Sequence, residues 1–521
     1  MKVARIGIIT AVYIALTYGL AEAQISSGGQ PVSFQKRVGD YVPMISMPAV
    51  DAEALLAEDE RDGKLGVPFR FGYKHDVSLN PDNSGVWETL DDGGRLWRLA
   101  IKCPEAYSIN LVYDQYRLPE GARLFVYSDD RNVVLGAFTS GNNKEHGKFA
   151  TAPTRGDVTI LEYYLPPGVD DPGLLSLVRV VHAYKDIFFG PLKEVDPTEH
   201  FGHSDFCEIN VNCPEGEPWK NEVRSVVMYI VDEAWQCSGV MVNNVREDQT
   251  PYMLTANHCH GPEETILVVF NYQSPSCENI VGPGDMTLSG ATLVAANDYS
   301  DFKLVQLSEQ PPASYDVYYA GWSAIDIASQ SSVCIHHPEG DIKKISFDDD
   351  SLLSADYLLS YGDSHWRVGN WELGTTESGS SGSPLFDPEH RIVGQLHGGM
   401  ASCRRIKPDW YGKFSKSWDY GTTPETRLKD WLDPDNTGTL VLDGLDTECC
   451  VGMTGNIDGD PYDIVDPMDI VYLAEWMWAG GPAPPCMEEV DVDGSGYPDL
   501  MDAVYLVTYF WEGGPPPVDC P

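Results

Sequence analysis

Two short stretches decide the fold and the chemistry expected of this chain: Thr255-Ala-Asn-His-Cys259 and Gly379-Ser-Ser-Gly-Ser-Pro384. The first places a histidine beside a cysteine at the end of an apolar run, and the second places a serine in a glycine-flanked turn. A serine hydroxyl is a poor nucleophile at neutral pH until a base takes its proton. A turn of small residues also leaves backbone N–H groups uncovered, so that they can stabilise an oxyanion. We therefore predict that His258 and Ser381 belong to a catalytic triad, which needs a carboxylate as its third member.

Asp301 is the carboxylate that we select, because the order His, Asp, Ser fits a chymotrypsin-like arrangement. It precedes residues 302–307, where apolar and polar side chains alternate as in a half-buried strand. Other aspartates of this interval stand in turn-rich or charged settings and are interpreted as solvated loop residues: Asp285, Asp298, Asp326, Asp341, Asp348, Asp349 and Asp350. Each motif alone is weak, since lone histidines are more often structural and Gly-Ser loops are usually linkers. Their order in one chain favours the catalytic interpretation.

The chain then resembles a known family, the chymotrypsin-fold serine endopeptidases, and more closely the bacterial lysyl endopeptidases, from about Cys207 to Leu445. Segments that carry this resemblance include Cys207-Glu-Ile-Asn-Val-Asn-Cys213, Ala320-Gly-Trp322, Ile335-His-His-Pro338, Gly394-Gln-Leu-His-Gly-Gly399 and Trp431-Leu-Asp-Pro434. The resemblance implies a mainly β fold, with two six-stranded barrels, a C-terminal helix and the triad in the cleft between the barrels. We expect a helix that begins at Pro424, capped by Thr423, and runs to Leu432.

The resemblance also implies three disulfides, namely Cys207–Cys403, Cys213–Cys277 and Cys237–Cys259. The last would clamp the loop of His258 to the preceding strand. Cys103 and Cys334 are left over, and at least one of them is expected to be free or differently used. The pair His336-His337 is interpreted as structural, because no further ligands at zinc-like spacing follow it.

The roles implied for the site follow from the triad. Ser381 attacks the scissile carbonyl, His258 takes and returns the proton, and Asp301 orients the histidine. The N–H groups of Gly379 and Ser381 form the oxyanion hole. One position departs from trypsin-like zymogens, which have an aspartate where this chain has Ser380. A serine cannot pair with a new N-terminus, so propeptide removal is expected to act by uncovering the cleft.

Specificity rests on a second part of the resemblance. Asp409 stands in Asp409-Trp-Tyr-Gly412 after the Gln-Leu-His-Gly-Gly strand, where lysyl endopeptidases carry the aspartate that binds the substrate lysine. His397 occupies the position of the family's pocket-wall histidine, which stacks against a tryptophan there. No tryptophan aligns here, and the stretch 356–362 offers tyrosines instead, so cleavage after a basic residue is a firmer expectation than lysine over arginine.

The N-terminus predicts export. Lys2 and Arg5 precede an apolar stretch that ends at a small-x-small site before Gln24, which is typical of a signal peptide over residues 1–23. A membrane anchor is the alternative, but the stretch is short for a bilayer span, and no other run is long enough to span in the mature chain. The formal net charge of −44 opposes nucleic-acid binding. Twelve cysteines behind a signal peptide indicate disulfides.

Residues 24–202 carry no catalytic constellation. Alternating runs such as residues 95–101, 108–113 and 123–127, separated by turn residues, predict a β-sandwich. It looks like the propeptide that related proteases carry, with Lys193 as a self-cleavage point; a permanent β domain is the alternative. The protease domain is expected over residues 203–447.

Residues 448–521 are expected to form a small helical module that resembles the dockerins. Their composition changes, since no Lys or Arg follows Cys449, and two acidic loops each precede an apolar helix. The spacing of oxygen ligands in the second loop matches an EF-hand-type calcium site, with Asp491, Asp493, Ser495, Asp499 and Asp502 as its ligands. The first loop has two extra residues and lacks the glycine, with Asn456, Asp458, Asp460, Asp466 and Asp469 as ligands.

Cysteines 449, 450, 486 and 520 are expected to cross-link the module to itself. An acidic disordered tail is the alternative, which the apolar helices oppose. Dockerins attach enzymes to cohesin partners, so a cohesin-like partner is the corresponding expectation.

Two functions remain open at this point. The first is a secreted serine endopeptidase that acts on protein or peptide substrates through His258, Asp301 and Ser381, without a cofactor for catalysis, and carries a calcium-dependent docking tail. The second is a non-catalytic binding or scaffold protein on a protease-like fold. Such proteins usually lose a triad member or the oxyanion glycine, and this chain retains all of them.

Overall fold

The computed structural model describes most of the chain from residue 26 onward. The described ranges are 26–39, 41–62, 68–187, 204–405, 407–446, 450, 453–459, 464–479, 481, 484, 486, 488–495 and 498–520. The expected signal peptide, Gln24 and Lys193 therefore lie outside the described residues. Within the described residues, no helix combines the length and the apolar character that a bilayer crossing requires.

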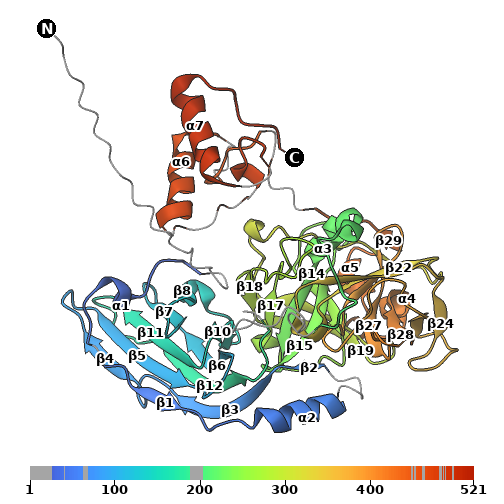
Figure 1. The fold of residues 1–521 in the computed structure, drawn as a ribbon, viewed down its shortest axis with the longest axis horizontal. Coiled ribbons are helices and arrows are strands. Elements are labelled where there is room, and N and C mark those ends of the chain that lie inside the picture. The colour runs from blue at the N-terminus through green and yellow to red at the C-terminus, as the bar shows by residue number, and fades with distance from the viewer. Residues whose placement is uncertain are drawn as a thin grey trace.

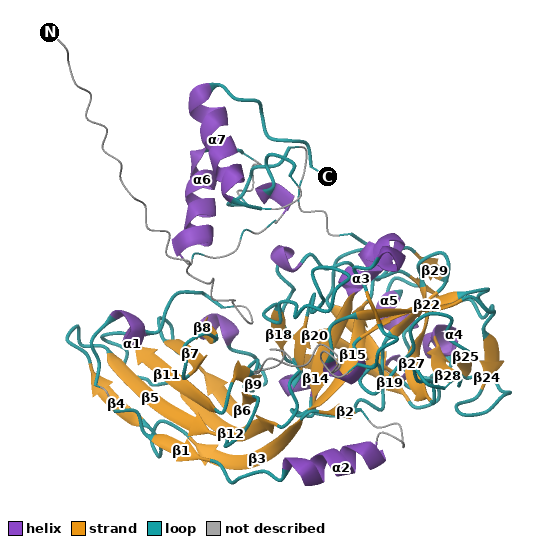
Figure 2. Ribbon diagram, viewed as in Figure 1, coloured by secondary structure: helices purple, strands orange, loops and turns teal. Residues whose placement is uncertain are grey.

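The N-terminal part is a sandwich of two mostly antiparallel sheets (Figures 1 and 2). One sheet has the order β1 (Met44–Ser46), β5 (Arg95–Lys102), β11 (Val158–Leu165), β7 (Arg123–Ser128) and β8 (Val134–Phe138), with β4 (Val86–Thr89) beside β5. The other has the order β10 (Thr154–Arg155), β6 (Ser108–Arg117), β12 (Leu174–Ala183) and β3 (Gly72–Leu79), with β9 (Phe149–Ala150) beside β6. Along β5, Trp97, Leu99 and Ile101 enter the main core while Leu96 packs in a separate cluster, as the two-residue period of a strand requires.

The second part, which we call the protease part because the sequence predicts a protease domain there, contains two further sheets. The first has the order β18 (Thr287–Ser289), β17 (Leu267–Val269), β14 (Val226–Val231), β15 (Trp235–Met241), β16 (Tyr252–Ala256), β20 (Phe302–Leu307) and β19 (Ala291–Asn297). The second has the order β13 (Ile209–Asn210), β23 (Lys344–Asp348), β22 (Ser332–His336), β26 (Pro384–Phe386), β27 (Ile392–Gly399), β28 (Asp409–Lys413), β25 (His365–Val368) and β24 (Leu353–Ala355), with β21 (Trp322–Ser323) and β29 (Val441–Leu442) attached. The fold is mainly β, as the sequence predicts.

The sandwich and the protease part share one hydrophobic core. The short strand β2 (Phe69–Arg70) leaves the sandwich and pairs with β15 at Trp235 and Gln236. Phe69 is buried in the same cluster as Ile230 and Val269 of the protease sheet. Figure 1 shows the two β parts side by side, with β2 reaching across.

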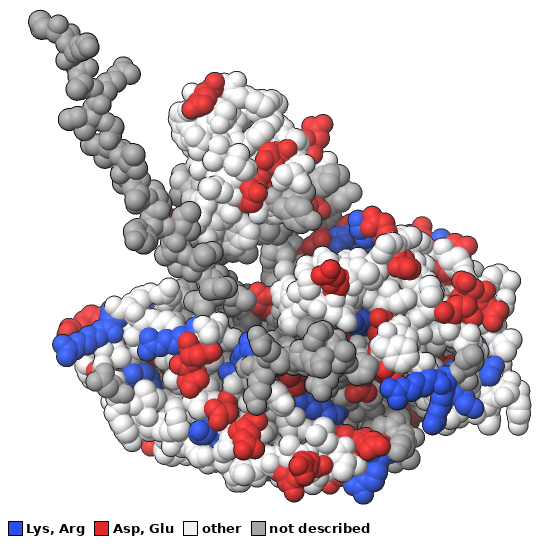
Figure 3. Space-filling view, viewed as in Figure 1, with Lys and Arg blue, Asp and Glu red and all other residues white. Residues whose placement is uncertain are grey.

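The C-terminal part is a pair of helices closed by a disulfide. Helix α6 (Pro467–Ala474) and helix α7 (Leu500–Glu512) place Leu473 and Leu506 in one small core, and Cys450 is bonded to Cys520. Figure 3 shows acidic but no basic side chains on this part, which agrees with the sequence.

The prediction of one helix from Pro424 to Leu432 is wrong. The chain forms a 3-10 turn, η7 (Pro424–Thr426), and then the short helix α5 (Lys429–Leu432). Arg427 between them is extended, with φ −153° and ψ 156°, and its guanidinium pairs with Asp430. The predicted capping by Thr423 and the Pro424 start are present, but at the turn.

Candidate active site

The histidine and the aspartate meet because their strands are paired. Strands β16 and β20 run antiparallel with Ala256 opposite Phe302, so the residues that flank this end of the pair come together. The His258 Nδ1 lies 2.7 Å from Asp301 Oδ2, and the His258 backbone N–H donates to Asp301 Oδ1 at 2.9 Å. Asp301 is 4% exposed and has a φ of 56°, which turns the chain into β20. These two contacts fix the orientation of the His258 ring.

The turn that carries Ser381 packs against strands β15 and β16. The Ser381 carbonyl accepts from the Ser238 N–H at 2.9 Å, and Ser381 itself is 8% exposed. A Cβ at Gly382 would come within 2.8 Å of the Ala256 nitrogen, so only glycine allows this approach. His258 Nε2 is buried, and among the described residues it makes no hydrogen bond, to Ser381 or to any other group. Catalytic hydrogen bonds are often long in proteases without substrate.

Two backbone donors are free beside the serine. The Gly379 and Ser381 N–H groups donate to no acceptor within the described part of the chain, whereas the Ser380 and Gly382 N–H groups are both used. Gly379 has a φ of 90°, and a Cβ there would meet Gln236 Oε1 at 2.1 Å. Free, preorganised N–H groups are what an oxyanion hole requires.

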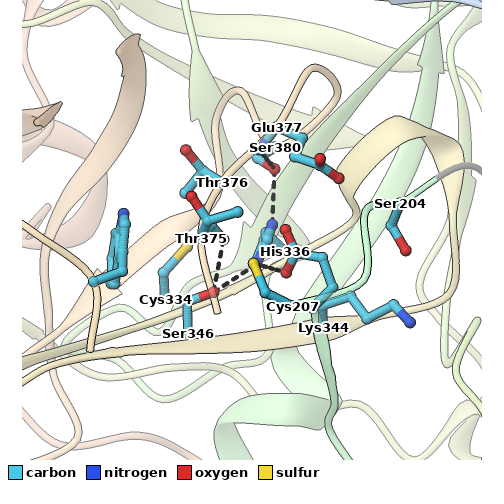
Figure 4. A network of polar contacts seen from close by, with 12 residues as sticks. Ser204, Cys207, Cys334, His336, Lys344, Ser346, Thr375, Thr376, Glu377 and Ser380 are labelled. Atoms are coloured by element: carbon cyan, nitrogen blue, oxygen red, sulfur yellow. Dashed lines mark hydrogen bonds and ion pairs between the residues drawn. The ribbon is translucent and has the colours of Figure 1, made fainter. Parts of the chain in front are cut away.

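Ser380 is held by a buried histidine instead of a charged N-terminus. Its Oγ lies 2.7 Å from His336 Nδ1 and accepts from the Glu377 N–H at 3.1 Å (Figure 4). The other ring nitrogen of His336 lies 3.2 Å from Ser346 Oγ. Burial lowers the pKa of His336 to about 3, so the ring is neutral at neutral pH. Both His336 and His337 are fully buried, and His336 supports the turn that contains Ser380 and Ser381.

The rings of Tyr357, His397 and His258 form one stack. Tyr357 stacks on His397, and His397 stacks on His258 with centroids 5.4 Å apart. His397 Nδ1 lies 2.9 Å from His365 Nε2 and 3.7 Å from Asp301 Oδ2. Burial lowers the pKa of His397 to about 4, which keeps its ring neutral beside His258. The sequence suggested a tyrosine here without selecting one, and it gave no signal for His365.

Asp409 lies at the start of β28, opposite Gly399 of β27, and is 1% exposed. Its Oδ2 accepts from the Trp371 indole N–H at 2.8 Å and from the Thr376 hydroxyl at 2.7 Å. Burial raises its pKa, and these hydrogen bonds oppose that rise. No sequence motif marks Trp371 or Thr376. Their contacts with Asp409 depend on how the loop before Ser381 folds against the start of β28.

Two aspartates interpreted as solvated are in fact buried. Asp341 and Asp348 are each 1% exposed. Asp341 accepts a hydrogen bond from the Ser204 hydroxyl, and Asp348 Oδ2 accepts from Ser332 at 3.2 Å. The sequence interpretation was wrong because it judged only neighbouring residues. The pairing of β22 with β23 buries Asp348, whereas Asp341 follows the turn η6 (Pro338–Gly340) and contacts Ser204, which is far away in the sequence.

The disulfides link distant parts of the protease sheets. The structure joins Cys207 to Cys403, Cys213 to Cys277 and Cys237 to Cys259, which are the three pairs that the resemblance implies. The leftover cysteines, Cys103 and Cys334, are both buried and free, and they lie in different parts of the molecule.

The second acidic loop of the C-terminal part gathers its carboxylates at the start of α7. The Ser495 N–H lies 2.9 Å from Asp491 Oδ1 and 3.0 Å from Asp493 Oδ1. Asp499 caps the helix, and its own N–H donates to Asp502 Oδ2 at 2.7 Å. Burial raises the pKa of Asp502, and the charges of Asp493 and Asp491 add to the rise. Clustered carboxylate oxygens of this kind fit Ca²⁺.

The first acidic loop repeats this arrangement at α6. Asp466 caps the helix and donates its N–H to Asp469 Oδ2 at 2.7 Å, and the Asp458 N–H donates to Asp469 Oδ1 at 3.0 Å. Asn456 is buried nearby, and Asp460 lies outside the described residues. The two extra residues of this loop therefore do not change how its last two aspartates meet the helix.

Comparison with known proteins finds family models that match both β parts. The model of the lysyl endopeptidase N-terminal domain matches residues 46–183, and that of the lysyl endopeptidase C-terminal domain matches residues 201–412. A lysyl endopeptidase of Pseudomonas aeruginosa is 27% identical over 384 residues, which is 68% of this chain and 80% of that protein.

Solved structures match the chain only in part. An HtrA-type protease, AlgW with a tripeptide, covers 37% of this chain and 57% of its own, with a TM-score of 0.27 and 15% identity. The Rv3671c protease in an inactive form covers 37% and 85%, with a TM-score of 0.25 and 18% identity. The two family models, together with the P. aeruginosa relative, show a serine endopeptidase that is similar to the lysyl endopeptidases and whose substrates are proteins or peptides.

Proposed function

We propose that this chain is a secreted endopeptidase that cleaves after lysine, using Ser381 as nucleophile, His258 as general base and Asp301 as the residue that orients the histidine. The observation that carries the proposal is the contact between His258 Nδ1 and Asp301 Oδ2 at 2.7 Å. The other ring nitrogen, Nε2, is buried and has no partner among the described residues. The free N–H groups of Gly379 and Ser381 support an oxyanion site beside it.

In this mechanism the hydroxyl of Ser381 attacks the scissile carbonyl carbon while His258 Nε2 takes its proton. The carbonyl oxygen becomes an oxyanion that accepts from the Gly379 and Ser381 N–H groups. His258 then protonates the leaving amine, and a water molecule repeats the sequence to release the acyl group from Ser381. Asp301 stays ionised and stabilises the imidazolium.

Asp409 is the proposed partner of the substrate lysine. It is a buried carboxylate, and an ammonium that reached it would form a charge-assisted hydrogen bond, which is about twice as strong as a neutral one. The flat Tyr357–His397 pair would form an apolar wall along the lysine stem. The P. aeruginosa relative, a lysyl endopeptidase by name, supports this specificity.

The test combines labelling with product analysis. The purified chain should react with a serine-directed fluorophosphonate, and the Ser381→Ala variant should not. Digestion of a denatured protein should give fragments that end in lysine, read by mass spectrometry. Asp409→Asn should still label at Ser381 but lose lysine cleavage by a factor of 100 or more, on the order of two charge-assisted hydrogen bonds. Unchanged lysine cleavage in that variant would refute the role of Asp409, and an unlabelled wild-type chain would favour the scaffold alternative.

Export and docking complete the proposal. The N-terminal stretch before Gln24 supports secretion, and the acidic loops at α6 and α7 would each hold a calcium ion that keeps the C-terminal part folded. The partner of this part would be a cohesin-like domain, as its resemblance to dockerins implies. Secretion is checked by sequencing the N-terminus of the exported chain: a start at Glu194 supports removal of a propeptide after Lys193, and a start at Gln24 supports a permanent β domain.

A further inference from the structure

A cluster of side chains that could ligate a metal lies in the N-terminal sandwich, away from His258, Asp301 and Ser381. His75 is on β3 and His182 is on β12, and these strands pair with Val180 opposite His75 and Tyr73 opposite His182. The two histidines are therefore diagonal neighbours on one face of their sheet. Cys103 directly follows β5, which belongs to the other sheet. One ring nitrogen of each histidine and the Cys103 sulfur lie within 4.8 Å of one another.

The cluster is buried and its polar atoms lack partners. His75 is 7% exposed, His182 is 2% exposed, and Cys103 is fully buried with a free thiol. His75 Nε2 and His182 Nδ1 make no hydrogen bond within the described residues. The buried His336 differs, because both of its ring nitrogens lie within hydrogen-bond distance of serine hydroxyls. A buried polar group without a partner costs free energy, and here two such ring nitrogens lie beside one free thiol, so a single shared ligand would satisfy all three.

We propose that Cys103, His75 and His182 bind one zinc ion, which ties the two sheets of the N-terminal sandwich together. One thiolate and two imidazoles form a borderline-soft ligand set that suits zinc rather than calcium or magnesium. Atoms that now lie within 4.8 Å of one another need only small side-chain rotations to reach zinc bond lengths of about 2.0–2.3 Å.

Asp157 is the candidate for the fourth ligand. Its backbone carbonyl accepts from the Cys103 N–H at 2.8 Å. Its carboxylate lies near both Cys103 and His182, since its charge acts on each of them. The zinc would draw its ligands from β3, β12 and the segment after β5, so it would stabilise the sandwich independently of any catalysis.

The experiment uses the full chain carrying Ser381→Ala, so that it stays intact. Zinc is measured by inductively coupled plasma mass spectrometry after dialysis in excess calcium, which fills the acidic loops. The chain is then stripped with a zinc-selective chelator and loaded with cobalt(II). We expect one zinc per chain, and a thiolate-to-cobalt charge-transfer band in the near ultraviolet. Stripping should lower the Tm, and zinc should restore it.

The matched control is Cys334→Ser, because Cys334 is the other buried free thiol of the described residues. It should keep the cobalt band, whereas Cys103→Ser and His182→Gln should lose the band and the zinc-dependent rise in Tm. The band is decisive because His258, Asp301 and His397 also lie within 4.8 Å of one another and could hold zinc without a thiolate. A cobalt-loaded parent chain without a thiolate band, or equal bands in the Cys103 and Cys334 variants, would overturn the proposal. The parent measurement stands even if a variant does not fold.

Discussion

The ring of Tyr357 lies flat on the ring of His397, with centroids 3.6 Å apart and 1° between the ring planes. His397 in turn stacks on His258. Tyr357, which lies on an irregular loop, therefore holds the ring of His397 in place beside the proposed catalytic base. Tyr357→Leu should lower kcat/KM for a lysine substrate by about 2- to 10-fold, since aromatic pairs contribute about 0.5–1.5 kcal/mol. Tyr357→Trp should preserve activity. Steady-state kinetics on a lysine ester decides this, and equal kinetics for the leucine variant would show that the stack is dispensable.

Asp301→Asn should lower kcat by about 10⁴-fold, because an amide favours the wrong tautomer of the triad histidine. The matched control is Asp298→Asn. Asp298 lies in the same turn, and its exposed carboxylate accepts a hydrogen bond from the Asn257 side chain at 2.5 Å. That control should change kcat by less than about threefold, as is usual for surface substitutions. Single-turnover measurements on both variants compare the chemical step. A loss below about tenfold in Asp301→Asn would contradict the assignment of Asp301.

Phe69→Ala should destabilise the sandwich and the protease part together. Phe69 is 3% exposed and lies in the core that both parts share, next to the pairing of β2 with β15. Removing a buried phenylalanine costs about 3–5 kcal/mol. Met44→Ala is the control, because Met44 is 55% exposed. Urea unfolding followed by tryptophan fluorescence and by residual activity should give coincident transitions for both signals. If the fluorescence transition shifted while the activity transition stayed unchanged, the two parts would be energetically independent.

Glu377→Gln should stabilise the chain at alkaline pH. Burial raises the pKa of Glu377 to about 7, and the charges of Asp205 and Asp341 add to the rise. When the pKa of a carboxyl is raised in the folded state, the group contributes its full stabilisation of that state at pH values below its unfolded pKa of about 4.5. This contribution is lost as the pH rises through 7. Glutamine cannot ionise, so the variant should gain about 1–3 kcal/mol over wild type at pH 8 and little at pH 5.

Urea unfolding at the two pH values measures this difference, with the exposed Glu389→Gln as control. The result expected for the control is the same free energy of unfolding as wild type at both pH values. A Glu377→Gln variant that is less stable than wild type at pH 8 would show that the ionised carboxylate is stabilising.

Asp502→Ala should remove one calcium ion from the C-terminal part. Asp502 accepts backbone N–H groups from both ends of its loop, at 2.9 Å from Val492 and 2.7 Å from Asp499. Its removal takes away a ligand and the loop's anchor. Isothermal titration of the intact chain with calcium should show the stoichiometry fall by one relative to Asp519→Asn, which lies outside the loop. An unchanged stoichiometry would exclude this loop as a calcium site.

Sequence motifs were sufficient for the parts of this protein that depend on local chemistry. The contact between His258 and Asp301 is present, and the alternating runs of residues 95–101, 108–113 and 123–127 form strands of the sandwich. The broken helix after Thr423 and the buried Asp341 and Asp348 were not predicted, because tertiary contacts override local propensity there. The contact of Trp371 with Asp409 was also invisible, since it joins residues from separate loops.

The sequence by itself determined which residues can carry chemistry, because nucleophiles, bases, cap residues and metal ligands are set by residue type and short spacing. Only the tertiary structure decided that β2 ties the sandwich to the protease sheet, that Tyr357 rather than Tyr361 stacks on His397, and that His75, Cys103 and His182 meet between two sheets. These contacts join residues far apart in the chain, and strand register and side-chain packing alone bring them together.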